Sequence, residues 1–168
     1  MSKLAQKMVE VAIEEIGTAE IGVSNCGPRV NLYKAATNLP PAESWAWCAA
    51  FVDWVCREAA IRAGVQFTRT FMRPTTAGAW ALEAWSLKQD NSTWTKRNPG
   101  RDIKPGDIIV FNFSHCGIAV SEPDDTGHFE TVEGNTSVGD AGSQRDGGGV
   151  HRRTRRTTQV RSRIRFRV

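Results

Sequence analysis

Apolar positions near the start of the chain recur with the period of an α-helix. Within residues 1–16, apolar side chains return at every fourth position, at Leu4, Met8, Ala12 and Ile16. Lysine and glutamate side chains occupy a different face of the same helical projection. This pattern predicts an amphipathic surface helix that ends near Gly17.

A second helix, which is more apolar, is predicted from Trp45 to about Arg62. This segment contains no glycine or proline and is rich in alanine and valine. We therefore expect it to be largely buried and to close near Gly64. Ser44 is a candidate for its N-cap.

Two other segments of the first half have weaker helical signals. Residues 22–44 are rich in glycine, asparagine, serine and proline and predict mostly loop, within which residues 30–36 could form a short helix. Thr75 or Thr76 is expected to open a further helix over residues 77–87.

After Pro105 the period of the apolar positions changes from helical to extended. Short runs of apolar or β-branched residues, separated by turn residues, predict an antiparallel meander over residues 108–113, 117–121 and 128–133. Residues 134–149 contain six glycines, which predicts a mobile loop. Over residues 160–168 arginines alternate with Val160, Ser162, Ile164, Phe166 and Val168, and this period of two predicts one more strand.

Helices followed by strands favour an α+β fold, in which N-terminal helices pack on a C-terminal antiparallel β-sheet. We expect the 168 residues, 40% of them hydrophobic, to form a single domain, residues 1–168. The longest apolar run, residues 45–52, is far shorter than the roughly 20 residues that a transmembrane helix needs. Charged residues interrupt the first sixteen, so no signal peptide is predicted and synthesis in a cytoplasm is expected.

The charge is distributed unevenly. The chain has a net charge of +4, but residues 1–146 carry 14 basic and 18 acidic side chains, so the last 22 residues carry +8. This asymmetry predicts a polyanionic neighbour, such as nucleic acid, lipid headgroups or an anionic cell envelope. The alternative is a solvated strand face. The eight basic residues are Arg152, Arg153, Arg155, Arg156, Arg161, Arg163, Arg165 and Arg167.

Four of these arginines alternate with the apolar residues of the final strand. Because Ile164, Phe166 and Val168 require the inward face, the other positions should face outward. The pattern therefore predicts one outward cationic stripe, made by Arg161, Arg163, Arg165 and Arg167.

The cysteines suggest neither a disulfide framework nor a metal site. Cys26, Cys48, Cys56 and Cys116 form no CxxC pair, so free thiols are expected. Zinc binding by Cys48, Cys56, His115 and Cys116 is disfavoured because adjacent strand residues point to opposite faces. The sequence also contains no phosphate-binding loop, dinucleotide-binding motif or HExxH motif, so no cofactor is expected.

Cys48 is the candidate nucleophile. It lies in the first turn of the predicted central helix, where the helix dipole and free backbone N–H groups favour a thiolate. The alternative is a small, buried, unreactive side chain in an alanine-rich helix. A cysteine nucleophile needs an imidazole as base, and His115, at the start of a strand after a turn, is a better candidate than His128 or His151.

A third residue should hold the imidazole in place. Alternation along the third expected strand puts Glu133 on the same face as Phe129 and Thr131, and Asn135 follows two residues later. A carboxylate on an apolar face needs a partner, because an unpaired buried charge is costly. That partner could be the imidazole or an arginine.

Several segments, in this order along the chain, resemble the CHAP group of peptidoglycan hydrolases, which belongs with the NlpC-type papain-like cysteine peptidases. The similarity in motif order runs from residue 16 to about residue 156. The segments are residues 47–52, residues 105–111 with His115 and residues 117–120, and residues 132–136.

The resemblance implies a papain-like catalytic domain in which Cys48 attacks an amide carbonyl and His115 transfers the proton. Glu133 or Asn135 would orient the imidazole. The implied substrate is bacterial peptidoglycan, cut between N-acetylmuramic acid and L-alanine or within the peptide stem and its crosslinks. Attack would form a tetrahedral oxyanion, release an amine and leave a thioester for water to hydrolyse. The Cys48 backbone N–H is expected to be one oxyanion donor.

The sequence departs from that group in two ways, which change what we expect of metal binding and of domain organisation. Some CHAP domains bind calcium through an acidic loop before the cysteine, whereas residues 36–44 offer only Glu43, so no metal is expected. Many relatives carry a separate wall-binding domain. The single-domain architecture expected here resembles that of phage endolysins that act on Gram-negative hosts.

The sequence thus predicts a monomeric phage endolysin, made in the host bacterial cytoplasm and released to act on the cell wall. The alternatives are an interbacterial amidase toxin, an inactive CHAP-like wall-binding module, and a nucleic-acid binder that uses the basic end.

Overall fold

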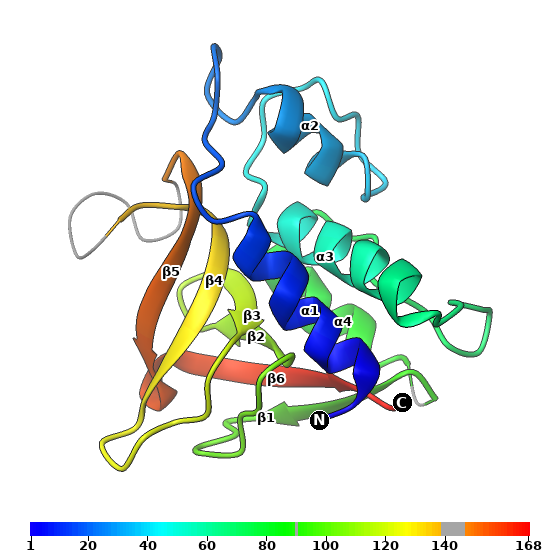
Figure 1. The fold of residues 1–168 in the computed structure, drawn as a ribbon, viewed down its shortest axis with the longest axis vertical. Coiled ribbons are helices and arrows are strands. Elements are labelled where there is room, and N and C mark those ends of the chain that lie inside the picture. Colours follow the sequence, from blue (N-terminus) through cyan, green and yellow to red (C-terminus); the bar gives the residue numbers. More distant parts are fainter. Residues whose placement is uncertain (90, 139–146) are drawn as a thin grey trace.

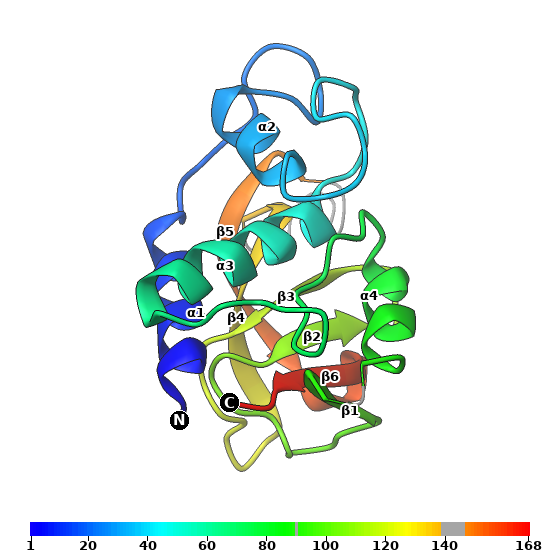
Figure 2. The ribbon, with the colours of Figure 1, turned by 90° about the vertical axis from the view of Figure 1, so that its right-hand side faces the viewer.

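The computed structural model describes residues 1–89, 91–138 and 147–168, which form helices on one antiparallel sheet (Figures 1 and 2). The helices are α1 (Lys3–Glu14), α2 (Pro28–Lys34), α3 (Cys48–Ala63) and α4 (Ala79–Ser86). The strands are β1 (Thr93–Arg97), β2 (Ile108–Phe111), β3 (Cys116–Ala119), β4 (His128–Thr136), β5 (Gly149–Arg156) and β6 (Val160–Phe166). The predicted α+β fold, with N-terminal helices packed on a C-terminal sheet, is confirmed.

Helix α1 follows the predicted amphipathic pattern. The Ser2 hydroxyl caps it by accepting a hydrogen bond from the Ala5 N–H, and Leu4, Met8 and Ala12 are buried. The helix ends before the expected Gly17, so Ile16 lies outside it and is partly exposed.

Helix α3 is the central helix of the fold. Gly64 closes it in the left-handed conformation, as predicted. The helix begins at Cys48, after Trp47, and the prediction that Ser44 caps it is wrong. The Ser44 hydroxyl instead donates to the Ser24 carbonyl at 2.9 Å, which ties two loops together.

The sheet has the strand order β1-β6-β2-β3-β4-β5, with antiparallel neighbours. The predicted meander corresponds to β2, β3 and β4, and the final alternating segment to β6. Strands β1 and β5 were not predicted. Strand β4 continues to Thr136, into the segment for which a mobile loop was expected; residues 139–146 of that segment lie outside the described residues.

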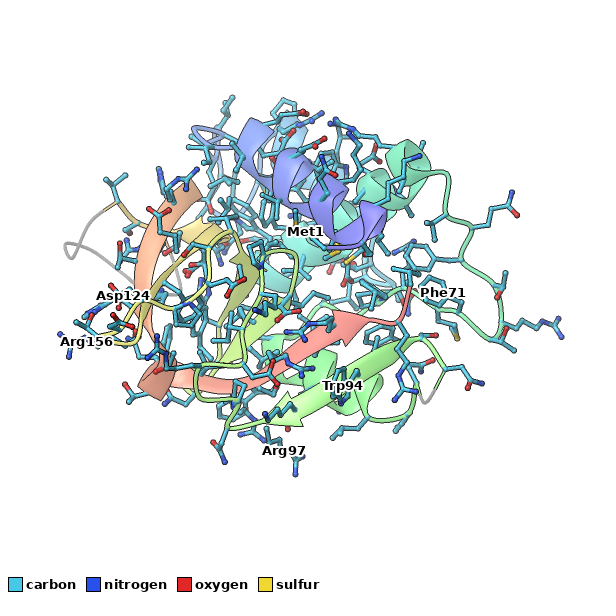
Figure 3. The ribbon with its side chains drawn as sticks, turned by 60° about the horizontal axis from the view of Figure 1, so that its bottom comes forward. Met1, Phe71, Trp94, Arg97, Asp124 and Arg156 are labelled. Atoms are coloured by element: carbon cyan, nitrogen blue, oxygen red, sulfur yellow. The ribbon has the colours of Figure 1, made fainter. Side chains whose placement is uncertain are left out.

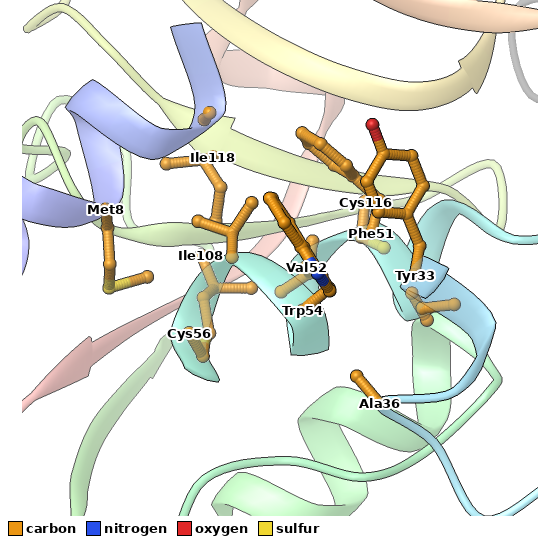
Figure 4. Packing of buried hydrophobic residues seen from close by; sticks show 14 of the residues in the cluster. Met8, Tyr33, Ala36, Phe51, Val52, Trp54, Cys56, Ile108, Cys116 and Ile118 are labelled. Carbon is orange, nitrogen blue, oxygen red and sulfur yellow. The ribbon is translucent and has the colours of Figure 1, made fainter. Parts of the chain in front are cut away.

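The main apolar core lies between α3 and the central strands. Helix α3 contacts α1 and α2 as well as β3 and β4, while α4 covers β1, β2 and β6 (Figure 2). Figure 4 shows Phe51 and Val52 of α3 packed among Ile108, Cys116 and Ile118 of the sheet. The core therefore fixes the start of α3 against the start of β3.

The predicted outward cationic stripe on β6 is wrong. Arg163 is 0% exposed and donates from Nη2 to Asp102 at 3.0 Å, and Arg165 donates from Nε to Asp107 at 2.7 Å. Arg161 instead pairs with Glu83 of α4 at 3.1 Å. Figure 3 shows β6 lying beside β1, whose Trp94 contacts the Arg163 guanidinium at 4.7 Å. The alternation is as expected, but acidic side chains cover the face that it leaves outward.

Candidate active site

Cys48 is the first residue of α3. Only 5% of its surface is exposed, and the backbone N–H of Ala49 interacts with its sulfur. Interaction with the Cys116 thiol, followed by interaction with His115 and with this N–H, holds the pKa of Cys48 well below its usual range. These effects outweigh burial, which alone would raise the pKa. The position therefore favours a thiolate.

His115 lies at the end of the turn that joins β2 to β3. Ser114 before it has a φ of +57°, and the ring of His115 is fully buried. Its Nε2 lies 2.8 Å from Oε2 of Glu133. A carboxylate can only accept, so Nε2 carries the proton and donates it.

The His115 ring also interacts with Cys48. Nδ1 is buried and makes no regular hydrogen bond to any described residue, but the ring interacts with the Cys48 sulfur. Burial alone would lower the pKa of His115, whereas Cys48 and Glu133 together raise it to about 9. A protonated imidazole beside a thiolate is the state that these shifts favour.

Glu133 is buried and bound on both of its oxygens. Arg155 donates from Nε to Oε1 at 2.8 Å and from Nη2 to Oε2 at 2.6 Å, and the Thr131 hydroxyl donates to Oε1. Although burial alone would raise the pKa of Glu133, Arg155 and His115 lower it to about 2. Both partners considered from the sequence, an imidazole and an arginine, are thus present together.

Two aromatic rings and a glycine shape the space around the Glu133 carboxylate and its partner Arg155. The rings of Phe111 and Phe113 stack on each other, and the Arg155 guanidinium lies 5.2 Å from each ring centre. On β3, a Cβ atom added at Gly117 would lie 2.6 Å from Cγ of Glu133. Glycine at this position leaves room for the Glu133 side chain.

Asn135, the alternative orienting residue, makes no hydrogen bond to His115. It lies in an irregular step of the β4–β5 pairing, with a φ of +56°, and is buried. Neither its amide oxygen nor its amide nitrogen has a hydrogen-bond partner among the described residues. Glu133 is the residue that the structure places on the imidazole.

Cys116 and Arg155 were missed by sequence reasoning. His115 and Cys116 were expected to point to opposite faces, yet both interact with Cys48 because His115 precedes β3 in a tight turn. The need of Glu133 for a partner pointed to some arginine, but nothing in the sequence selected Arg155. Cys56 is buried in the middle of α3, and the four thiols are free.

No group of three or more His, Cys, Asp or Glu side chains that could hold a metal ion occurs within residues 1–89, 91–138 and 147–168. In the same parts of the chain, no helix has the length and apolar character required to cross a bilayer.

Comparison with known proteins places this site in a family. The family model of the CHAP domain matches residues 40–135, more than half of the chain. The chain belongs to the CHAP domain family. The matched region contains Cys48, His115, Glu133 and Asn135, whereas Arg155 lies beyond it.

The fold of this CHAP domain is similar to that of an endolysin of known structure. The crystal structure of a wild-type endolysin, LysIME-EF1, superposes with a TM-score of 0.55 and 17% sequence identity. The match covers 98% of this chain and 64% of the endolysin, so the chain spans less than two thirds of that protein. No match was found among curated proteins.

Proposed function

We propose that this CHAP domain is a cysteine-dependent amide hydrolase that acts on bacterial peptidoglycan. The proposal is carried by one arrangement: the Cys48 sulfur at the N-terminus of α3, the His115 ring facing it, and Glu133 at 2.8 Å on the far ring nitrogen. A nucleophile, a base and an orienting acceptor in this relation suit acyl transfer.

The chemistry follows from these positions. The Cys48 thiolate forms a bond to the carbonyl carbon, and an electron pair moves to the carbonyl oxygen. The proton on Nδ1 of His115 passes to the leaving nitrogen as the C–N bond breaks, which gives a free amine and a thioester. Neutral His115 then takes a proton from water as the water oxygen bonds to the thioester carbon. The C–S bond breaks, Cys48 leaves as the thiolate, and the acid product loses its proton to solvent.

The developing negative charge on oxygen needs preorganised donors. The first turn of α3 supplies backbone N–H groups and the positive end of the helix dipole beside the sulfur. We propose the Cys48 N–H as one oxyanion donor.

Peptidoglycan is proposed as the substrate because of the family and the structural likeness to an endolysin. Two classes of amide bond fit the mechanism: the bond between N-acetylmuramic acid and L-alanine, and a peptide bond of the stem or crosslink. An endolysin is the favoured biological role, and an interbacterial toxin would use the same chemistry.

We also propose contact with the anionic cell envelope through the arginines that stay on the surface. Of the eight C-terminal arginines, those that are exposed are Arg152, Arg156 and Arg167. Surface cations steer association with anionic surfaces, and salt screens this effect.

The direct test is digestion of purified peptidoglycan. Cys48→Ala should abolish the release of fragments, because it removes the thiol that interacts with the His115 ring, while Cys56→Ala should remain active as the matched control. Mass spectrometry of the fragments then identifies the bond, because an amidase frees the N-terminus of L-alanine and an endopeptidase frees one within the stem. Substantial residual activity in Cys48→Ala would refute the assignment of the nucleophile.

A further inference from the structure

Cys116 is a fully buried thiol beside the proposed nucleophile that the mechanism above does not use. It is the first residue of β3, directly after His115, and belongs to the same apolar cluster as Cys48 and Phe51 (Figure 4). Helix α3 packs against β3 and β4. A Cβ atom added at Gly134 of β4 would lie 2.7 Å from Cβ of Phe51 and 2.8 Å from Cζ3 of Trp47, so the start of α3 lies against this end of the sheet. The side chains of Cys48 and Cys116 interact directly, and both thiols are free.

We propose that Cys116 is a positioning residue whose thiol donates a hydrogen bond to the sulfur of Cys48 and holds that sulfur as a thiolate aimed at the substrate. This role in catalysis rests on the proposed function, whereas the contact between the two thiols does not.

The surroundings of Cys48 leave few groups to stabilise a negative sulfur. His115 precedes β3 and faces the sulfur, and the Ala49 N–H approaches it from α3. Asp53 on the same helix and Glu133 on β4 are the carboxyls in the neighbourhood. Neither makes a hydrogen bond to the Cys48 sulfur, because the Asp53 oxygens have no partner among the described residues and the Glu133 oxygens bind other groups. The Cys116 thiol is therefore a third donor to the Cys48 sulfur, beside His115 and the Ala49 N–H.

The protonation state of Cys116 suits a hydrogen-bond donor. Burial, followed by the interaction with Cys48, raises the pKa of Cys116 well above its usual range, so that it keeps its proton while Cys48 loses one. Burial also raises the pKa of Asp53, which lessens its negative charge near the two sulfurs. The pair thus divides into one thiolate and one thiol.

The alternative role is packing alone, because a cysteine is also a small apolar side chain. Two substitutions separate these roles. Cys116→Val keeps an apolar side chain but removes the donor, and Cys116→Ser keeps a donor in nearly the same position. A packing role predicts that valine is the milder change, whereas a donor role predicts that serine is.

The test follows the alkylation of Cys48 by iodoacetamide, with peptide mass spectrometry to assign the label, from about pH 4 to about pH 9, since only the thiolate reacts. We expect Cys116→Val to move the acid limb of the profile upward by about one pH unit, which is about tenfold slower labelling on the acid side. Cys116→Ser should stay close to the wild-type profile. Cys56→Ala, which changes a buried cysteine two turns along α3, should not move it.

Thermal unfolding of each variant shows whether it is folded. Superimposable wild-type and Cys116→Val profiles, or equal shifts for valine and serine, would overturn the proposal. Alkylation does not involve peptidoglycan. If the protein fails to digest peptidoglycan while the valine and serine profiles still differ, the proposed function falls and the thiol contact stands.

Discussion

At the scale of single residues, Glu133 sets the charge state of the site. It lies between the two cationic groups of His115 and Arg155, and is buried with them. A carboxylate that faced only an imidazolium would compete with it for one proton. Arg155 adds to the effect of His115, and together they hold the pKa of Glu133 near 2 despite its burial, so the proton stays on the ring. The Cys48 thiolate then faces a full positive charge.

The charge state gives a pH prediction. The active form pairs a Cys48 thiolate with protonated His115, so kcat/KM should fall as His115 loses its proton near pH 9, where its pKa lies. Glu133→Gln removes the carboxylate that stabilises the imidazolium. The alkaline limb should therefore move down towards the ordinary histidine pKa of about 6.5, with a large loss of rate. The measurement is a pH–rate profile on a soluble muropeptide.

Glu130→Gln is the matched control for this prediction. Glu130 is on the same strand, but it pairs with Arg152 at the surface. Its removal should leave the alkaline limb in place. An unchanged limb in Glu133→Gln would mean that another group raises the pKa of His115.

Sequence reasoning found the residues of this site that carry a local signal. Cys48 at a helix start, His115 after a turn and Glu133 on an apolar face are brought together in the structure, and their catalytic roles stay predictions. Arg155 could not be chosen, because its contact with Glu133 depends on the register of β4 against β5. Cys116 was set aside by a strand rule that fails where the chain turns.

At the scale of elements, the strands that sequence reasoning missed lack apolar alternation. Strand β5 reads Gly-Val-His-Arg-Arg-Thr-Arg-Arg, and its inward positions include Arg153 and Arg155, which are buried. Strand β1 is a short polar strand at the opposite edge of the sheet. Apolar periodicity reports burial against a core, and it cannot report burial of an arginine whose acidic partner lies in another element.

The pairing of β3 with β4 depends on one small residue. Gly117→Ala would place a Cβ atom 2.6 Å from Cγ of Glu133 and 2.9 Å from the Val132 carbonyl oxygen. Strand β4 or the carboxylate has to shift, and Glu133 would lose its geometry with His115. We expect a loss of about 1–3 kcal/mol in the free energy of unfolding, together with a fall in kcat that is larger than the change in KM.

Gly78→Ala controls for the general effect of an added methyl group. A Cβ atom at Gly78, which precedes α4, meets nothing closer than 3.4 Å. This variant should keep both stability and activity, as measured by thermal unfolding and muropeptide turnover. Full activity in Gly117→Ala would show that Glu133 does not need its present position.

At the scale of the whole molecule, the uneven charge of the sequence is largely an internal balance. Acidic residues of the first 146 positions pair with arginines of the last 22: Glu133 with Arg155, Asp107 with Arg165, and Glu83 with Arg161. These C-terminal arginines are therefore bound by acidic side chains within the fold, and the basic end does not form a single surface patch. Sequence alone could not show this, because partners up to 78 positions apart meet only once the sheet has formed.

Because some of the C-terminal arginines are buried and others are exposed, their effects on stability and on surface attachment can be measured separately. Arg163 is buried and bound to Asp102 and to the Trp94 carbonyl, so Arg163→Gln removes the buried guanidinium that joins these two groups. Asp102 keeps Lys96 and Arg165 as partners, and we expect the free energy of unfolding to fall by about 1–3 kcal/mol. Replacing the exposed Arg152, Arg156 and Arg167 by glutamine should change stability much less, by about 0.5 kcal/mol per site. It should instead weaken salt-sensitive attachment to outer-membrane-bearing cells. Denaturant unfolding and cell sedimentation over a salt series measure the two effects. An unaltered stability in Arg163→Gln would contradict the structural role of its bonds to Asp102 and Trp94. Attachment that depends neither on salt nor on the three exposed arginines would rule out the proposed envelope contact.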